Sequence, residues 1–440
     1  MISIDYSKLP NRDIMFLDIK SFFASVECVK LRLPIMDSYL AVCSRMDLRG
    51  GLVLASTPMM KSRFGIKTGS RMYEIPKRNY ITLVPPRMDL YLRVNQMIID
   101  LLLRYVAPED LLVYSIDEMC VDLTDYVKLY KKDAVTLAKE IQWRIYTELK
   151  LISTVALAPN PLLAKIAMDT ESKKNMDHFA HWTYDDVPTK LHNIRPLSKM
   201  WGIGDKTESK LNDLGIYSVG DLANHDVNIL KRIFGIMGEE YFYHAHGVDY
   251  TILSDRKTQK QTPNLKRPNI SFSSSEVLPK DYTRRFDIET VLREHADKVS
   301  KKLRKHKLLA TTIKVFVGFS KHEEEDKGFS HQMKIDATYS RKALGEQVLK
   351  LFRKYYYNEA VRRIAITCSN LVTSALKPYN LFDDLKAIQK EEKLDKVMDV
   401  IQSRFGLKAC CLGYSLSEAG TAISRSRLIG GHGTSVGRVN

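Results

Sequence analysis

The sequence has no long apolar run. No stretch approaches the ~20 consecutive apolar residues that a helix needs to cross a bilayer. The opening residues, MISIDYSKLPNRD, do not place an apolar core after a basic segment, as a secretion signal does. We therefore expect a cytoplasmic protein without a membrane partner.

Cysteine is scarce and is never arranged with metal-binding or redox spacing. The chain has six cysteines in 440 residues and no C-x-x-C motif, which disfavours both a disulfide framework and a structural zinc site. We expect mostly buried thiols. No G-x-G-x-x-G motif follows a predicted strand, which argues against a doubly wound dinucleotide-binding sheet.

What the sequence has in excess is positive charge. Lysine and arginine number 68 against 52 acidic residues, a formal net charge of +16. This balance favours nucleic acids, because basic side chains displace the counterions condensed on phosphates. Charge alone leaves a merely basic soluble protein as an equal alternative. The length predicts roughly two to four domains.

The first part of the chain alternates strand and helix patterns. Apolar periodicity predicts strands at 12–19, 50–56, 111–116, 119–125 and 153–158, and helices at 20–33, 87–105, 131–150 and from 161 onward. This order suits an antiparallel or mixed sheet that is backed by helices.

The second part divides into a helical region, a linker and a second α/β region. Residues 185–250 predict helices, and the polar, basic, proline-bearing residues 251–269 are typical of a linker. Residues 270–370 return to α/β, and 384–405 predict a helix. The glycine-rich end is expected to lack regular structure.

Three carboxylates lie where predicted strands end. Asp18 ends the first strand, and Asp117-Glu118 stands at a tight connection between two strands. Acids between apolar strands are costly unless they are solvated, paired or bound to metal. Phosphoryl transfer gains from two Mg²⁺ ions, which prefer carboxylate oxygens, and the carbonyl of Ile19 is a natural additional ligand. From position alone, ordinary turn or capping residues remain the simpler interpretation.

The motifs DIKSFFASVE (18–27) and YSIDEMCVDLTD (114–125) resemble those of the Y-family DNA polymerases, closest to the UmuC-like branch of Gram-positive bacteria. The resemblance covers nearly the whole chain in the family's order. It implies an α/β (α+β) multidomain right-hand polymerase with a ferredoxin-like palm, small fingers, a helix-hairpin-helix thumb and an α/β little finger. The implied bounds are palm 11–36 and 80–180, fingers 37–79, thumb 185–250, linker 251–269, little finger 270–370 and C-terminal tail 371–440.

The resemblance implies roles for the motif residues. Asp18, Asp117 and Glu118 are the implied catalytic acids that hold two Mg²⁺ ions with the Ile19 carbonyl. Phe22 and Phe23 belong to the implied nucleotide site, where Phe23 matches the steric gate that excludes a ribose 2′-OH. A core aromatic is the equally plausible interpretation of Phe23 without the resemblance.

Other implied nucleotide-binding residues lie in LASTPMMKSRFGIKTG (54–69) and PLLAKIAMD (161–169). Ser56 takes the place of a hydroxyl that contacts the triphosphate. Lys165 takes the place of a triphosphate-binding lysine, although an isolated helix lysine is usually solvated.

The chain departs from many family members at two positions. Lys20 stands where many relatives have a second acid, as in the UmuC-like branch, so we do not expect this change to inactivate. Ser62 replaces an arginine, and either Lys61 or Arg63 is expected to substitute for it.

Three further segments are candidate contacts with macromolecules. Gly202, Ile203 and Gly204 form the implied hairpin turn, whose N–H groups would bind DNA phosphate without sequence preference. The basic run 280–307 is either a DNA-binding face or a solvated helix face. PYNLF (378–382) resembles a degenerate sliding-clamp motif, with a local hydrophobic contact as the alternative.

The resemblance therefore implies an error-prone, lesion-bypass DNA polymerase that uses primer-template DNA and dNTP. The resemblance also implies an SOS response role, association with the nucleoid on DNA, and a UmuD-like accessory subunit. A catalytically silent DNA-binding relative is the alternative, although it would be expected to lose the acids. A nucleotide cyclase with a similar palm gives no reason for the hairpin or the basic second region.

Overall fold

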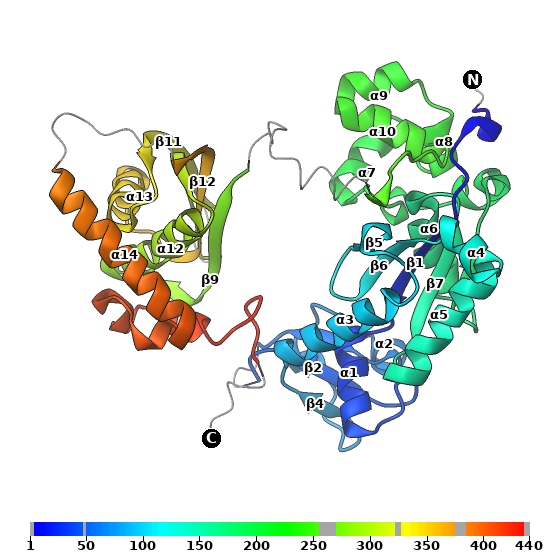
Figure 1. Ribbon diagram of the computed structural model, residues 1–440, viewed down its shortest axis with the longest axis horizontal. Helices are drawn as coiled ribbons and strands as arrows, with labels where there is room; N and C mark the ends of the chain where they lie inside the picture. The colour runs from blue at the N-terminus through cyan, green and yellow to red at the C-terminus, as the bar shows by residue number, and fades with distance from the viewer. Residues whose placement is uncertain (1–3, 47–49, 255–269, 322–326, 375–383, 435–440) are drawn as a thin grey trace. The chain divides into compact units, whose positions relative to one another are not determined.

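The computed structural model describes residues 4–46, 50–254, 270–321, 327–374 and 384–434 (Figure 1). Contacts divide the chain into two compact units. Unit 1 holds the described residues up to 254 together with 432–434, and unit 2 holds those from 270 to 431. Most of the predicted linker, 255–269, lies outside the described residues, as does the predicted clamp-binding segment 378–382.

A mixed sheet forms the centre of unit 1, in the strand order β5-β6-β1-β7-β8. Its strands are β1 (Ile14–Ile19), β5 (Leu111–Val113), β6 (Glu118–Asp122), β7 (Ser153–Ala158) and β8 (Phe179–His181). β1 is antiparallel to both β6 and β7, whereas β7 and β8 are parallel. The predicted mixed sheet is therefore confirmed.

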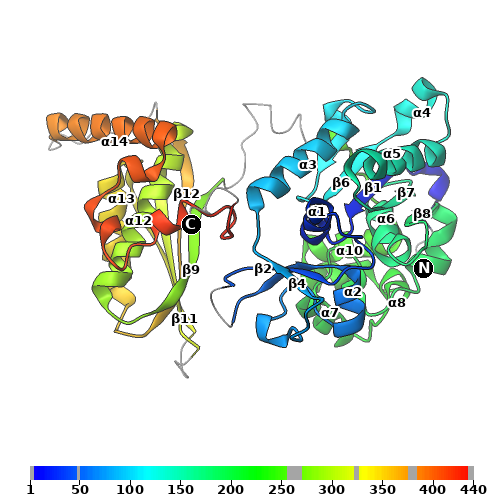
Figure 2. The same ribbon diagram turned by 90° about the horizontal axis from the view of Figure 1, so that it is seen from below.

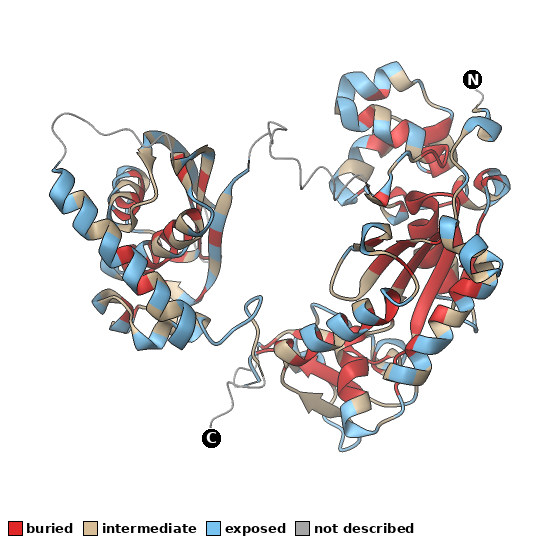
Figure 3. Ribbon diagram, in the orientation of Figure 1, coloured by how far each residue is buried: buried red, intermediate tan, exposed pale blue. Residues whose placement is uncertain are grey.

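β1 is buried on both faces of this sheet, because its apolar residues run almost without interruption. Ile14 and Phe16 belong to one hydrophobic core, and Met15 and Leu17 belong to the other, as a period of two requires. Helices α1 (Phe22–Leu31), α3 (Met88–Leu102) and α5 (Ala134–Leu149) cover the Met15 face, and α6 (Pro161–Ala167) covers the opposite face. Figure 3 shows the strands as a buried layer.

The helix ends follow the capping chemistry of the sequence. The Asp133 carboxylate accepts a hydrogen bond from the Thr136 amide at 2.9 Å and begins α5, which ends at Lys150 in the left-handed conformation. Asn160 caps α6 and Pro161 occupies its first turn. Both predicted helices are confirmed.

Unit 1 also carries a small sheet at one end and a group of helices at the other (Figure 1). The small sheet contains β2 (Leu40–Cys43), β3 (Val53–Ser56) and β4 (Thr82–Val84), and packs with α2 (Pro58–Phe64) in a core of its own. The helices are α7 (Asp205–Asn212), α8 (Val219–Ala223), α9 (Val227–Phe234) and α10 (Ile236–Ala245). A separate short helix, α4 (Thr124–Tyr130), follows β6 and precedes α5 in the chain. β2, β3 and α2 fall in the range predicted for the fingers and α7 to α10 in the range predicted for the thumb, whereas β4 and α4 fall in the range predicted for the palm. The boundaries stay predictions.

Unit 2 is built on an antiparallel sheet in the order β11-β10-β12-β9. Its elements are β9 (Phe272–Tyr282), α12 (Arg285–Lys305), β10 (Leu308–Phe319), β11 (Gly328–Thr338), α13 (Arg341–Tyr355) and β12 (Val361–Thr373). Helices α12 and α13 lie on the same side of the sheet and share its core (Figure 2). The predicted α/β pattern of 270–370 is confirmed, with β11 as an additional edge strand that sequence reasoning missed.

Buried ion pairs hold the C-terminal helices α14 (Leu385–Phe405) and α15 (Ala422–Arg425) to unit 2. Arg304 of α12 contacts Asp399 at 2.7 Å, and Arg341 of α13 contacts Asp395 at 2.9 Å. Arg425 contacts two buried or half-buried glutamates of α12 and β9 at 3.2 and 3.1 Å. The helix predicted at 384–405 is confirmed, and these contacts make it part of unit 2.

The described end of the chain returns to unit 1. The amide of Met88, at the start of α3, donates to the carbonyl of Gly433 at 3.1 Å. Residues 435–440, the remainder of the glycine-rich end, lie outside the described part of the chain.

Most of the cysteines are buried thiols. None of the six cysteines, all of which lie among the described residues, forms a disulfide, and Cys28, Cys43, Cys120 and Cys368 are buried, as predicted. Burial raises the pKa of Cys28 and of Cys43 to about 11, so these thiols stay protonated. Within the described ranges, no helix is both long enough and apolar enough to cross a membrane.

Candidate active site

The three predicted acids lie together where the end of β1 meets the start of β6, at one end of these two central strands. Asp18 on β1 and Glu118 on β6 are direct partners across the antiparallel ladder. The Ile19 amide donates to the carbonyl of Asp117 at 2.9 Å, which fixes the residue before β6 beside the end of β1. Positions about a hundred residues apart in the sequence therefore lie side by side in the sheet.

Ser115 shapes the turn that carries Asp117. Its hydroxyl donates to the Asp117 carboxylate at 2.7 Å and accepts from the Glu118 amide at 3.1 Å. The Tyr114 and Ser115 amides both donate to the carbonyl of Glu118, at 2.9 and 3.0 Å. The S-I-D-E sequence thus closes a tight turn and holds one acid at its tip.

Two lysines neutralise the acids. The Lys165 ammonium contacts Glu118 at 2.6 Å, and the Lys173 ammonium contacts Asp18 at 2.7 Å. Asp169 lies between them, at 3.1 Å from Lys165 and 2.7 Å from Lys173. Sequence reasoning missed Lys173, for which the only local signal is its i,i+4 spacing from Asp169.

A wide turn of π-helix, Met168–Ser172, separates the two lysines. Such turns add one residue to an α-helix and often occur at functional sites. The side chain of Lys165 is only 8% exposed, while that of Lys173 is 39% exposed. Lys165 is therefore buried against its carboxylates, and Lys173 is the more accessible cation.

The electrostatics of Asp18 reflect this crowding. Burial raises the pKa of Asp18 to about 6; the Lys173 ammonium opposes that rise, while Asp117 and Glu118 add to it. Burial alone would lower the pKa of Lys173, but Asp18 and Asp169 raise it above its usual value. The acids thus form a centre of negative charge that is compensated by ammonium groups.

The donor set fits hard divalent cations. Among the described residues, no three or more His, Cys, Asp or Glu side chains are already gathered to hold a metal ion. The reason is visible in the contacts, since Glu118 is turned to Lys165, Asp18 to Lys173 and Asp117 to Ser115. The lysine ammonium groups supply the positive charge beside the acids, where metal ions would also be attracted. Carboxylate oxygens are the ligands that Mg²⁺ prefers.

The two aromatic residues at the start of α1, Phe22 and Phe23, differ in burial: Phe22 is buried and Phe23 is partly exposed. Phe22 is buried in the core with α3, which leaves its predicted nucleotide contact as a prediction. Phe23 is partly buried and stacks on Tyr91 with ring centroids 4.3 Å apart. The α1 N-cap, Ser21, adopts a left-handed conformation with φ 51°.

The finger segment brings Lys61 toward the acids, while the predicted triphosphate contact of Ser56 stays a prediction. The Ser56 hydroxyl is buried and donates to the carbonyl of Ile66 at 2.7 Å. The Lys61 ammonium donates to the Ser21 hydroxyl at 2.8 Å; burial lowers the pKa of Lys61, and the nearby Asp18 carboxylate opposes this. Arg63 donates instead to the Tyr39 hydroxyl at 2.9 Å. Lys61 is thus the cation of this helix that faces the site.

The predicted hairpin turn lies beside the carboxylate turn. Gly202 has φ +92°, a conformation that favours glycine, and Gly204 is the N-cap of α7. Ile203 is buried and anchors the turn in the core. The Trp201 indole donates to the Tyr114 hydroxyl at 3.1 Å, which links the hairpin to the turn of Asp117.

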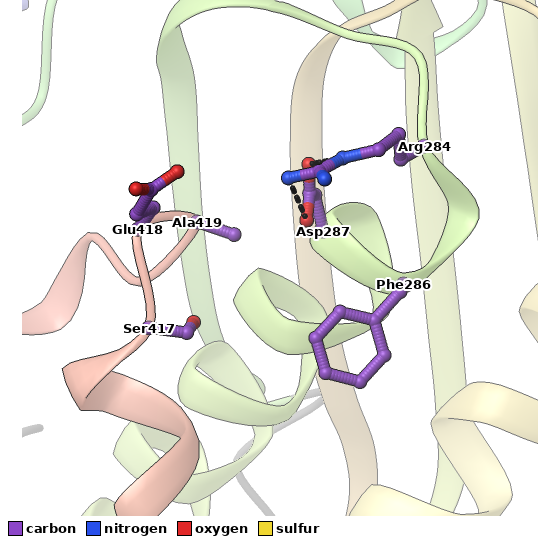
Figure 4. A pocket seen from close by; sticks show the side chains of 6 residues that line it. All are labelled: Arg284, Phe286, Asp287, Ser417, Glu418 and Ala419. Atoms are coloured by element: carbon purple, nitrogen blue, oxygen red, sulfur yellow. Dashed lines mark hydrogen bonds and ion pairs between the residues drawn. The ribbon is translucent and has the colours of Figure 1, made fainter.

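Unit 2 uses part of the predicted basic run for its own structure. Arg284 contacts Asp287 at 2.8 Å, and Arg304 contacts Asp399 at 2.7 Å. Figure 4 shows Arg284 and Phe286 beside a hollow that is also lined by residues 417–419. This hollow measures about 240 Å³ and contains none of the three site acids.

Sequence models of one family match three parts of the chain. The impB/mucB/samB family matches residues 17–169, its C-terminal domain matches 270–381, and the HHH motif of the IMS family matches 184–216. These ranges contain the acids, the basic region of unit 2 and the hairpin turn.

Individual proteins are similar over almost the full length. UvrX of Bacillus subtilis (strain 168), provisionally named a UV-damage repair protein, is 40% identical over 98% of this chain and 99% of its own. DNA polymerase IV 2 of the same organism is 32% identical over 95% of this chain and 98% of its own. A solved structure titled Y-family DNA polymerase chimera Dbh-Dpo4(243-245)-Dbh has a TM-score of 0.62 at 22% identity, covering 82% of this chain and 99% of that one, which shows the same fold.

Proposed function

Because the chain belongs to the Y-family of DNA polymerases, the impB/mucB/samB family, we propose that Asp18, Asp117 and Glu118 form the two-Mg²⁺ centre of a lesion-bypass polymerase. The enzyme is a DNA-directed DNA polymerase, and the proposed reaction is attack of a primer 3′-OH on the α-phosphate of a dNTP with release of pyrophosphate. The single observation that carries the proposal is the pairing of Asp18 with Glu118 at one sheet edge beside Asp117.

The proposed roles follow from charge and position. Two Mg²⁺ ions would stabilise the attacking and leaving oxygens of the displacement. Asp18, Asp117, Glu118 and the Ile19 carbonyl would hold them. Lys173 keeps positive charge next to the acids, where a triphosphate would gain from it. Lys165 is a second candidate for the triphosphate, although its ammonium is engaged with Glu118 and Asp169.

The remaining roles concern sugar and DNA. Phe23 would exclude ribose by packing under the sugar. The 202–204 turn would bind DNA phosphate through backbone N–H groups, which gives binding without sequence preference. DNA binding would place the protein at the nucleoid. The clamp contact through 378–382, the UmuD-like subunit and the SOS role remain proposals that rest on the family.

Template-directed extension is the direct test of the function. The purified chain with primer-template DNA, dNTPs and Mg²⁺ should extend the primer, should stop when EDTA is added, and should resume with excess Mg²⁺. A template that carries a lesion should still be copied past the lesion. DNA binding without any extension in Mg²⁺ would instead support the catalytically silent alternative.

Lys61 should matter for nucleotide binding because it replaces the family arginine at Ser62. A Lys61→Ala variant should raise the KM for dNTP by about tenfold, as loss of one charged contact predicts, with a smaller change in kcat. Arg63→Ala is the matched control, since this neighbour on α2 pairs with Tyr39 and not with the site. Steady-state kinetics in which Arg63→Ala had the larger effect would contradict the assignment.

A further inference from the structure

The ring beneath Phe23 belongs to Tyr91 of α3. The two rings are stacked at 4.3 Å with an interplanar angle of 14°. Tyr91 is completely buried, at 0% exposure, whereas Phe23 is partly exposed. A buried ring that lies flat against a surface ring limits how far the surface ring can tilt or retreat.

Tyr91 is itself fixed by a buried carboxylate. Its hydroxyl donates to the Glu27 carboxylate at 2.7 Å, and Glu27 is 1% exposed. The Arg87 guanidinium, one helical turn before Tyr91 on α3, donates to both carboxylate oxygens of Glu27, at 2.9 Å for its Nε. Burial and the adjacent Glu27 raise the pKa of Tyr91, so the phenol keeps the proton that it donates.

These contacts form a hydrogen-bond network that links α1 to α3. Glu27 lies four residues after Phe23 on α1, on the same helix face, and Tyr91 of α3 lies four residues after Arg87, the N-cap of that helix. A buried carboxylate is costly unless its oxygens are paired, and here both oxygens accept hydrogen bonds. This hydrogen-bond network therefore holds the Tyr91 ring in one place and one orientation.

We propose that Tyr91, fixed by Glu27 and Arg87, is a positioning residue for sugar selection. It keeps the Phe23 ring from yielding when a ribose 2′-OH presses on it. The inference rests on the proposed function, in which Phe23 excludes ribose. A gate made of one ring rejects an added hydroxyl only if the ring cannot move aside, because a shift of a fraction of an ångström relieves the clash.

The test compares dNTP and matching rNTP incorporation in four proteins: wild type, Tyr91→Leu, Phe23→Ala and the double variant. Tyr91→Leu should lower the dNTP-to-rNTP selectivity in kcat/KM by roughly tenfold, mainly through better use of rNTP. The double variant should be no less selective than Phe23→Ala alone, because Tyr91 acts through Phe23. Tyr91→Phe keeps the stack, loses the anchor, and should show a smaller loss than Tyr91→Leu.

Two controls separate positioning from packing. Tyr184→Leu removes another stacked tyrosine, which packs on Tyr6 at 5.2 Å in the opposite core, and should leave sugar selectivity unchanged. Glu27→Gln keeps the shape and an acceptor for Tyr91, and it covers the case in which Tyr91→Leu does not fold. It should show a partial loss of selectivity.

The possible outcomes test separately whether Phe23 excludes ribose and whether Tyr91 positions Phe23. If Phe23→Ala loses selectivity but Tyr91→Leu and Glu27→Gln do not, Tyr91 is a packing residue and the inference is overturned. An additive loss in the double variant also overturns it, because Tyr91 would then act independently of Phe23. If Phe23→Ala leaves selectivity unchanged, the gate assignment fails and the inference fails with it.

Discussion

An Asp18→Asn variant should lose templated nucleotide addition by about 1000-fold or more in kcat, because a neutral amide is a poor ligand for the metal ions that the acids are proposed to hold. Loss of metal-ion stabilisation corresponds to several kcal/mol, and about 4 kcal/mol equals three powers of ten in rate. The measurement is single-turnover primer extension in Mg²⁺. Asp117→Asn should behave in the same way.

The fold should survive this change. Lys173 keeps Asp169 as a partner at 2.7 Å, and the loss of one charge relieves repulsion among the three acids. The melting temperature should therefore not fall. Asp122→Asn at the far end of β6, where the side chain accepts from the Thr124 amide, is the matched control and should keep activity. Extension by Asp18→Asn within tenfold of wild type would falsify the two-metal proposal.

Phe23→Ala should gain the ability to incorporate ribonucleotides. Removing the ring leaves space for the 2′-OH, and selection by a single packing contact is typically worth about 1–3 kcal/mol, or roughly 10- to 200-fold. The selectivity ratio of kcat/KM for dNTP over rNTP should fall by that range. Val29→Ala on the same helix packs on the same core and should leave the ratio unchanged.

The contrary result is equally clear. If the Phe23→Ala variant still rejects rNTP as strongly as wild type does, the sugar is selected elsewhere. A fall in activity toward both nucleotides without a change in their ratio would indicate that Phe23 is only a core aromatic, which was the alternative from sequence alone.

Sequence periodicity predicted most of the regular elements, because the strands and helices bury continuous apolar patterns. β1 and α5 are such cases, and both are confirmed. β11 was missed although Phe329, Met333 and Ile335 alternate along it, because an edge strand with exposed Ser330 and Gln332 carries a weak apolar signal. The residues predicted for the metal centre do lie together, where the end of β1 meets the start of β6.

What the sequence could not predict are pairings between distant segments. Lys173 reaches Asp18, and Tyr91 stacks on Phe23, only because the sheet and helices bring these positions together. Neither Lys173 nor Tyr91 lies in the motifs 18–27, 54–69, 114–125 and 161–169. The burial of the Ser56 hydroxyl, which donates to the Ile66 carbonyl at 2.7 Å, is likewise a contact within the fold that its motif position did not reveal.

The register of β1 against β6 also limits how this chain can change in evolution. Because side chains alternate between faces, deletion of one residue within either strand would turn Asp18 or Glu118 to the opposite face. Substitutions can therefore accumulate along these strands, whereas changes in their length cannot. The turn at Met168–Ser172 behaves differently, since a π-helical turn absorbs one additional residue within a helix and still delivers Lys173 to Asp18. Within one active centre, the helix already accommodates one additional residue between its two lysines, whereas the strands must keep their count.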